Sequence, residues 1–432
     1  MRSPNILFMT SHDTGDWLGC YGHRTVHTPS LDALEKEGCR FANSFCTSPV
    51  CTPSRGSLMT GRYPQTNGLM GLIQTPYRWR YHQGERHLSH LLGGQGYHTV
   101  LFNHQHEAPH DSPLGFRERR LVNCGAHELR TGEHVTTAGK TAEAVIEFFR
   151  EHSDDDAPFY AQAGFFETHT PYDWSGAEAD DSCGIEVPPY VVDDADARHH
   201  IAALQRAIQS LDRAVGRILH ALSETGLDQN TIVVFTVDHG VELPHCKWEL
   251  YDGGIRTALL MRGPQDIIPP GKVCDWLVSN VDVVPTLLDL TNLPTPANVQ
   301  GQSFFEFFRN ERADPPRDAV FAMMHSHDRW VESRCVRTQQ YKLIRNFSPS
   351  RARAMPVRSG PSSMQERAVV ELYDLRTDPH ELSNIRTDTR YEQIRRELDK
   401  RLLGWLRDVN DPILHGPVKT PYYRMAMADL TR

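Results

Sequence analysis

The sequence predicts an α/β fold in which a mostly parallel sheet is covered by helices on both faces. Strand-like and helix-like segments alternate over about the first 300 of the 432 residues, which is the pattern of such sheets. Residues 231–237 (TIVVFTV) form an uninterrupted apolar, β-branched run, typical of a strand that is buried on both faces. Residues 201–222 carry apolar side chains at spacings of mostly three and four, which predicts one long amphipathic helix.

Three further strands and two further helices are predicted in the same part of the chain. The strands are short apolar runs at residues 6–9, 99–102 and 159–166. One helix is expected to begin after Pro29, with Ser30 as its N-cap, and to end at Gly38. The other helix is expected over residues 141–152.

Polar residues follow three of the predicted strands at the point where each strand ends. They are Asp13, His169 and Asp238. Ligands of parallel sheets bind at the carboxyl ends of the strands, because the connecting loops and helix N-termini meet there. The sequence therefore predicts a site at this edge of the sheet.

A smaller α+β subdomain is predicted over residues 316–432, after a large α/β domain over residues 1–315. Its elements are two short strands, a segment rich in Arg, Ser and Pro, and a terminal helix, at 319–323, 341–345, 348–366 and 390–406. We expect the strands to belong to a small antiparallel sheet.

The composition excludes several classes of protein. The chain has 46 Lys and Arg against 55 Asp and Glu, a net charge of −9, whereas a nucleic-acid binder normally shows a basic excess. No apolar run approaches the roughly 18 residues of a membrane span, and no signal peptide is visible. Nine scattered cysteines are expected to be reduced. We therefore expect a cytoplasmic protein with neither nucleic acid nor a membrane as partner.

The most specific motif is residues 51–62, CTPSRGSLMTGR. It resembles the sulfatase signature C-x-P-S-R-x-x-x-L-T-G-R, with Met59 at the Leu position. The resemblance implies that a separate maturation enzyme oxidises Cys51 to formylglycine. A thiolate that attacked sulfur would leave a stable adduct, whereas the hydrate of an aldehyde offers one hydroxyl to attack and a second to expel sulfate.

Other motifs of this family follow in the same order along nearly the whole chain. They are residues 5–8 (NILF), 168–171 (THTP), 236–240 (TVDHG), 252–256 (DGGIR) and 371–375 (ELYDL). The chain thus resembles the formylglycine-dependent sulfatases, and among them the N-sulfoglucosamine sulfohydrolases. The resemblance implies an alkaline-phosphatase-like sheet sandwiched by helices.

The resemblance also implies one divalent metal ion, calcium or manganese. A sulfate ester is anionic and is repelled by an acidic protein, so the site must concentrate positive charge, and a bound cation supplies it. The expected ligands are Asp13, Asp238, His239 and the side chain at Cys51. The imidazole of His239 shifts the expectation from calcium toward manganese.

Two histidines depart from the family pattern. His12 stands where an acidic residue is usual, and it is either a nitrogen ligand or a residue that orients Asp13. His104 stands where a lysine usually binds a sulfate oxygen. Either it replaces that lysine as a partly protonated group, or it points elsewhere and another cation serves. His106 matches the histidine that contacts formylglycine.

The remaining roles are implied residue by residue. Arg55 is expected to hold substrate oxygens or the formylglycine hydrate, and Lys247 to clamp the developing oxyanion. His169 is the expected general acid, which matters most when the leaving group is an amine. His325 and His327 either line the substrate pocket or lie on the surface.

These expectations combine into hydrolysis of a sulfate ester or sulfamate, of a small or terminal sugar, with release of inorganic sulfate. One alternative is hydrolysis of phosphonate monoesters or phosphodiesters, which related proteins with His beside the second metal-binding Asp perform. The other is an inactive protein that binds sulfated ligands, suggested by the changed residues His12 and His104. Intact Cys51, Pro53 and Arg55, which the maturation enzyme would read, argue against it.

Overall fold

The structure is a computed structural model that describes residues 3–74, 78–109, 114–123, 137–172, 178–310, 312–327, 330–348 and 367–430. The predicted segment 348–366 lies outside the described residues, apart from Ser348. Across these ranges, the structure has no helix that is both long and apolar enough to cross a membrane.

The main sheet has nine strands in the described part of the chain. They are β1 (Asn5–Ser11), β2 (Cys39–Phe45), β3 (His98–His104), β4 (Glu118–Asn123), β5 (Phe159–Gly164), β6 (Thr231–Val237), β7 (Arg256–Thr257), β8 (Leu259–Arg262) and β9 (Lys272–Ser279). Their order is β4-β3-β5-β1-β6-β8-β2-β7, and β9 pairs with β2. The strands from β4 to β6 are parallel, whereas β8 is antiparallel to both neighbours. The predicted, mostly parallel sheet is confirmed.

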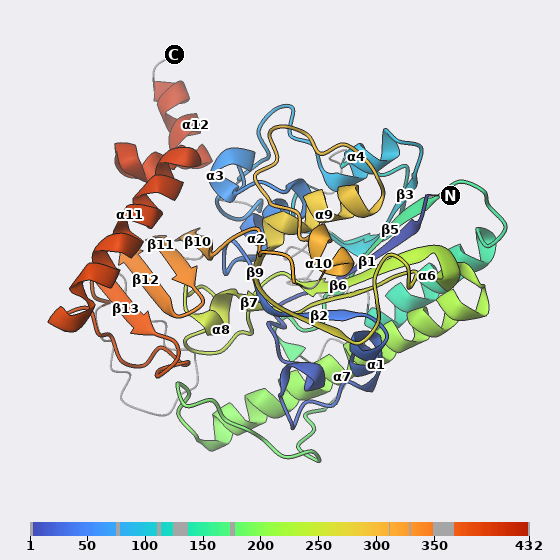
Figure 1. Ribbon diagram of the computed structural model, residues 1–432, viewed down its shortest axis with the longest axis horizontal. Coiled ribbons are helices and arrows are strands. Elements are labelled where there is room, and N and C mark those ends of the chain that lie inside the picture. The colour runs from blue at the N-terminus through green and yellow to red at the C-terminus, as the bar shows by residue number, and fades with distance from the viewer. Residues whose placement is uncertain are drawn as a thin grey trace.

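Helices cover both faces of this sheet (Figure 1). One face carries α1 (Pro29–Lys36), α6 (Ala138–Glu151) and α7 (Ala195–Glu224). The other carries α2 (Cys51–Thr60), α4 (Leu88–Gly93), α9 (Val283–Leu290) and α10 (Phe305–Arg309). Strand β1 shows why both faces are apolar: Leu7 and Met9 pack on the first layer, and Ile6 and Phe8 on the second.

Shorter helices complete the large domain and the tail. They are α3 (Pro64–Asn67), α8 (Asp252–Ile255) and the 3-10 helices Gly19–Tyr21, Leu227–Asn230, Asn280–Asp282, Thr389–Tyr391 and Pro412–His415.

The start of α1 differs from the prediction. The helix begins at Pro29, so Ser30 lies inside it and the predicted N-cap is wrong; the N-cap position belongs to Thr28. The carboxylate of Asp212 in α7 accepts hydrogen bonds from the backbone N–H groups of Ser30 and Leu31. A neighbouring helix thus satisfies the amides that a local cap would otherwise serve.

A four-stranded antiparallel sheet follows, as expected for the C-terminal part. Its strands are β10 (Ala319–Ser326), β11 (Trp330–Thr338), β12 (Tyr341–Asn346) and β13 (Val370–Asp374), paired in that order. Helix α11 (Glu392–Asp408) packs on this sheet, and α12 (Pro421–Leu430) ends the described chain (Figure 1). Phe45 and Val50 pack with Val320 and Met324, so the two sheets share a buried cluster across the proposed boundary at residue 315.

A buried ion pair holds the tail against the small sheet, and it predicts acid sensitivity. Arg334 and Asp411 are both 0% exposed and join through two hydrogen bonds of 2.6 and 3.0 Å. Burial acts to raise the pKa of Asp411, but Arg334 outweighs it and holds this pKa below its usual value. The pair therefore stabilises the fold above about pH 4, the unfolded value, and this contribution is lost as pH falls through the lower folded pKa.

We expect Asp411→Asn to lower the free energy of unfolding by about 3 kcal/mol at neutral pH, because buried Arg334 keeps only the longer, 3.3 Å ion pair with Glu332. Urea unfolding measured from neutral pH down through pH 4 should show a smaller acid-dependent loss in the variant than in the unmodified chain. Asp399→Asn is the matched control. It breaks the half-exposed pair with Arg345 and should cost less than about 1 kcal/mol. Equal costs for the two variants would contradict the prediction.

Candidate active site

Four adjacent strands place most of the candidate residues at one edge of the sheet, the edge formed by the carboxyl ends of these strands. In the order β3-β5-β1-β6, their carboxyl ends or the loops that follow carry His104 and His106, then His169, then His12 and Asp13, then Asp238 and His239. Parallel neighbours end at the same edge, so residues up to 227 positions apart in sequence converge there; 239 − 12 gives that separation. The structure thus brings these seven predicted residues together.

Cys51 is the first residue of α2, and all ten residues of that helix are buried. Gly56 lets the helix approach its neighbours closely, because a Cβ there would lie 2.7 Å from Leu69 Cδ1. The Sγ of Cys51 is 3.3 Å from Nε2 of His239. Burial, reinforced by the charge of Asp13, raises the pKa of the Cys51 thiol well above its usual value. The unmodified side chain is therefore a protonated thiol and a poor nucleophile.

Two carboxylates and two imidazoles surround this sulfur. His12, Asp13, Cys51, Asp238 and His239 each offer a ligand atom, and these atoms all lie within 4.8 Å of one another. Asp13 takes a left-handed backbone conformation (φ 47°), and its N–H donates to Asp238 Oδ1 over 2.9 Å. Nδ1 of His239 donates to the Gly240 carbonyl over 3.0 Å, which leaves Nε2 facing the carboxylates.

This donor set fits a divalent cation. Carboxylate oxygens suit calcium and manganese, and a neutral imidazole is the usual additional ligand of a transition ion. A histidine that donates one ring N–H to a carbonyl and directs the other nitrogen inward has the orientation of a metal ligand. Asp13, Asp238 and His239 are the residues that would hold the ion, beside the side chain at position 51.

Lys247 lies inside the same cluster. Its Nζ donates to Asp13 Oδ2 over 2.5 Å and to Glu242 Oε2 over 3.1 Å, and it is 3.4 Å from Nε2 of His169. Burial opposes the charge of both Asp13 and Lys247. Their mutual attraction outweighs it, so the pKa of Asp13 falls well below its usual value and the pKa of Lys247 rises. The pair is therefore ionised at neutral pH.

Arg55 is fully buried, and its guanidinium faces the protein's own acceptors. Nε donates to Asp238 Oδ2 over 3.0 Å, Nη1 to Thr10 Oγ1 over 3.3 Å, and Nη2 to the Ser11 carbonyl over 3.1 Å. These bonds orient Asp238 and the end of β1. The arrangement favours a positioning role over the predicted contact with substrate oxygens.

His169 is neutral in the structure. Its Nδ1 donates to the Thr170 carbonyl over 2.6 Å, so Nε2 carries the lone pair that faces Lys247. Burial and the charge of Lys247 lower the pKa of His169 to about 3. The expected role as general acid therefore requires a proton at Nε2, which burial and the charge of Lys247 disfavour.

His104 and His106 lie beside His12. The ring centroids of His104 and His106 are 4.9 and 6.1 Å from that of His12. Burial first, and then the charges of Arg55 and neighbouring histidines, lower the pKa of His104 well below its usual value. A neutral His104 does not supply the positive charge that the resemblance assigns to a lysine at this position.

The two predicted histidines of the C-terminal part contact different residues. His325 is buried on β10, where Nδ1 is 2.8 Å from Glu332 Oε1 and the ring packs edge-on against Trp79. His327 packs against Trp248, the residue after Lys247, with ring centroids 5.3 Å apart. Their part in binding substrate stays a prediction, and the position of His327 favours it more.

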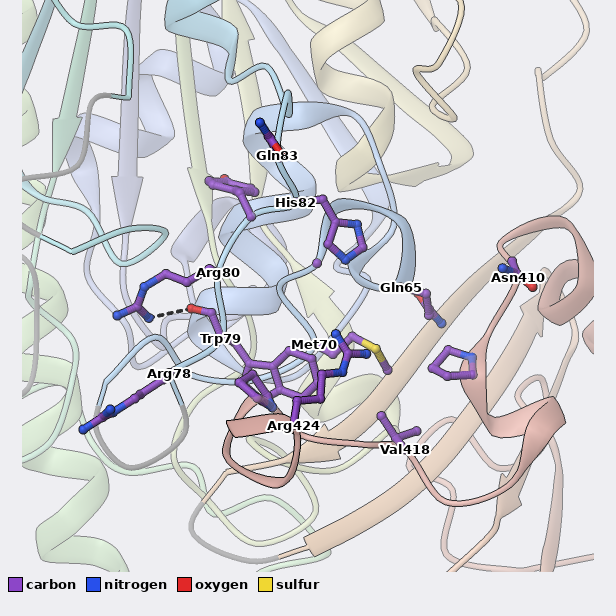
Figure 2. A pocket seen from close by; sticks show the side chains of 14 residues that line it. Gln65, Met70, Arg78, Trp79, Arg80, His82, Gln83, Asn410, Val418 and Arg424 are labelled. Atoms are coloured by element: carbon purple, nitrogen blue, oxygen red, sulfur yellow. Dashed lines mark hydrogen bonds between the residues drawn. The ribbon is translucent and has the colours of Figure 1, made fainter. Parts of the chain in front are cut away.

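A cavity of about 520 Å³ lies between the segment after α3 and the C-terminal tail. Figure 2 shows the side chains that line it. Arg78, Arg80 and Arg424 line it together with Trp79 and Tyr81. Sequence reasoning did not find this cavity, because its walls come from residues more than 300 positions apart. The arginines on either side of Trp79 were the feature of the sequence that could have indicated this cavity.

Comparison with known proteins adds to this geometry. A model of the sulfatase family matches residues 4–293, and a model described as "N-sulphoglucosamine sulphohydrolase, C-terminal" matches residues 245–408. The N-sulphoglucosamine sulphohydrolase of Homo sapiens is 26% identical over 475 aligned positions, which cover 96% of this chain and 92% of that protein.

Solved structures share the fold. One, in complex with its substrate D-glucosamine-2-N,6-O-disulfate, has a TM-score of 0.74 at 20% identity and covers 96% of this chain and 99% of its own. The phosphonate monoester hydrolase of Agrobacterium radiobacter has a TM-score of 0.69 at 19% identity, with coverage of 94% and 96%. The sulfatase model spans two thirds of the chain and includes the strand ends that form the site. The chain therefore belongs to the sulfatase family, whose members hydrolyse sulfuric esters.

Proposed function

We propose that this chain hydrolyses the sulfate ester or sulfamate of a small or terminal sugar, with formylglycine made from Cys51 as nucleophile and a divalent metal ion in the site. The observation that carries the proposal is the position of Cys51. It stands at the start of a buried helix with its Sγ 3.3 Å from His239 and among the carboxylates of Asp13 and Asp238. A nucleophile at that point faces the ligands of a cation and the ammonium group of Lys247.

Different residues of the chain would perform different parts of this reaction. A bound divalent ion would polarise the sulfate oxygens and lower the pKa of a hydroxyl nucleophile. Asp13, Asp238 and His239 would hold the ion, and Arg55 fixes the orientation of Asp238. Lys247 places a positive charge where negative charge develops on the sulfate oxygens.

The leaving group needs a proton, above all when it is an amine. His169 Nε2 lies 3.4 Å from Lys247 Nζ, which keeps its proton and its positive charge at neutral pH. Nδ1 of His169 is fixed by the Thr170 carbonyl, so Nε2 is the atom that would pass a proton, taken up from solvent, to the leaving oxygen or nitrogen. Near-complete burial of the carboxylates and of Lys247 keeps bulk water from weakening these charges.

A sugar sulfate or sulfamate is the substrate class that the relatives support. The human relative is named for the N-sulfated sugar it hydrolyses, and one solved neighbour holds a disulfated glucosamine. Hydrolysis of phosphonate monoesters or phosphodiesters is the second candidate. The imidazole of His239 among the ligands and the fold likeness to the phosphonate monoester hydrolase favour it.

One preparation tests both candidates. The chain is co-produced with a formylglycine-generating enzyme, and the proteolytic peptide that contains Cys51 is analysed by mass spectrometry. Turnover is then compared on an aryl sulfate, glucosamine N-sulfate and a phenyl phosphonate monoester. We expect the aldehyde or its hydrate at position 51 and higher kcat/KM on the sulfated compounds. A higher value on the phosphonate would support the second candidate, and an aldehyde without turnover on any of the three would overturn both.

A further inference from the structure

A second group of buried side chains lies beside the carboxylate cluster. His12, His104 and His106 are 1%, 0% and 4% exposed, and each offers a ring nitrogen within 4.8 Å of the others. Within the described residues, neither nitrogen of His104 and not Nδ1 of His106 has a hydrogen-bond partner. Buried polar atoms are almost always paired in native proteins, so three unpaired nitrogens in one cluster indicate a missing ligand.

The other nitrogens of this group are oriented as in metal sites. Nδ1 of His12 donates to Asp13 Oδ1 over 2.8 Å, so Nε2 is the ring nitrogen that this hydrogen bond leaves available to a ligand. Nε2 of His106 faces the side-chain amide of Gln74, whose Oε1 has no partner in the described chain. Exchanging the amide nitrogen and oxygen, which are interchangeable in shape, lets Gln74 accept a hydrogen bond from Nε2–H of His106. Nδ1 of His106 is then the free nitrogen.

This is the pattern of a metal-binding histidine, in which one ring N–H donates to an oxygen and the second nitrogen binds the ion. We propose that His12, His104 and His106 form a second metal site, separate from the site of Asp13, Asp238 and His239, for a borderline divalent ion such as Zn²⁺. Three imidazoles with one open position make a common zinc site. Zinc–nitrogen bonds of about 2.0–2.1 Å place tetrahedral ligand atoms about 3.3 Å apart, so the rings close by about 1.5 Å at most.

The surrounding charges accommodate a second cation. The charge of Arg55 acts on His104 and His106, and this guanidinium is paired with Asp238 at 3.0 Å. Glu107 follows His106 directly, is fully buried, and has an oxygen without a hydrogen-bond partner in the described residues. Asp13 accepts the hydrogen bond of His12 and so connects the two sites.

The second ion would supply the positive charge that neutral His104 does not. This part of the proposal rests on the proposed function: the ion would offer its open position to a sulfate oxygen, at the place where the family pattern has a lysine. The binding of the ion itself rests on the geometry of the three histidines alone. The two statements therefore fail independently.

Metal stoichiometry tests the proposal. His98, Glu118 and His152 form a half-buried trio that can also take zinc, so every protein carries His152→Ala. The full chain is stripped of metal, reconstituted with Zn²⁺, and its zinc content is measured by inductively coupled plasma mass spectrometry. We expect two zinc ions per chain in this background and one after His104→Lys, which replaces the ligand but keeps a cation. His87→Ala, which removes a buried histidine outside both clusters, should leave two.

Each outcome of this experiment either supports or overturns the second metal site. One ion in the background, or two ions that both remain after His104→Lys, overturns the second site. If circular dichroism shows that His104→Lys does not fold, the zinc X-ray absorption spectrum of the background protein replaces it. At two zinc ions per chain, an average of two imidazoles per zinc supports two sites, and an average of one overturns the proposal. Two bound ions without turnover on sulfated compounds would leave the metal site standing and remove the proposed function.

Discussion

Replacing Cys51 by alanine is expected to lower kcat on a sulfate ester by at least about 10⁴-fold, because the chain then lacks its nucleophile. Alanine removes only the Sγ atom, which in the structure is 3.3 Å from His239 and at the centre of the ligand cluster. The thiol has a raised pKa and takes no part in a strong ion pair, so the free energy of unfolding should change far less than the rate. Steady-state kinetics and urea unfolding measure the two quantities.

Cys46→Ala is the matched control. Cys46 is also buried, lies five positions earlier, and contacts the Ser48 carbonyl outside the ligand cluster. Its loss should leave the conversion of Cys51 and the kcat essentially unchanged. If Cys51→Ala retained the activity of the converted enzyme, position 51 would not be the nucleophile.

Lys247→Met carries the second-largest expected effect, a loss of about 10²–10³-fold in kcat. Methionine keeps much of the volume but removes the ammonium group that bonds Asp13 and Glu242 and lies 3.4 Å from His169. The loss should fall on kcat more than on KM, because the charge on the sulfate oxygens and leaving atom grows in the transition state. In metal-free protein we also expect a destabilisation of about 3 kcal/mol, since the buried carboxylate of Asp13 loses the ammonium group paired with it.

Lys342→Met separates this role from structure. Lys342 is equally buried and is paired with Asp252 and Glu381 at 2.5 and 2.8 Å. It lies on β12 of the small sheet and outside the ligand cluster. It should destabilise the fold by a similar amount while the kcat of the folded fraction stays within a few-fold. A Lys247→Met enzyme with unchanged kcat and only a raised KM would show that this lysine binds substrate without stabilising the transition state.

The elements predicted well are those whose pattern is local. Strand β6 has the predicted bounds, because a continuous apolar, β-branched run can be buried on both faces only as a central strand. Helix α7 extends the predicted stripe of residues 201–222 to Ala195–Glu224, because one face packs on the core and the other meets water. Helix α2 was not predicted. All ten of its residues are buried, so its sequence shows no alternation between apolar and polar faces.

The sequence by itself determined the family pattern around Cys51, the polar residues that follow the strands, and the departures at His12 and His104. These are properties of residue type and spacing along the chain. Only the tertiary structure decided that β3, β5, β1 and β6 are neighbours, that Arg55 bonds Asp238, and that His104 is buried without a hydrogen-bond partner among the described residues. The reason is physical: hydrogen bonding and desolvation depend on which segments lie side by side, and partners such as His12 and His239 are brought together only when the sheet forms.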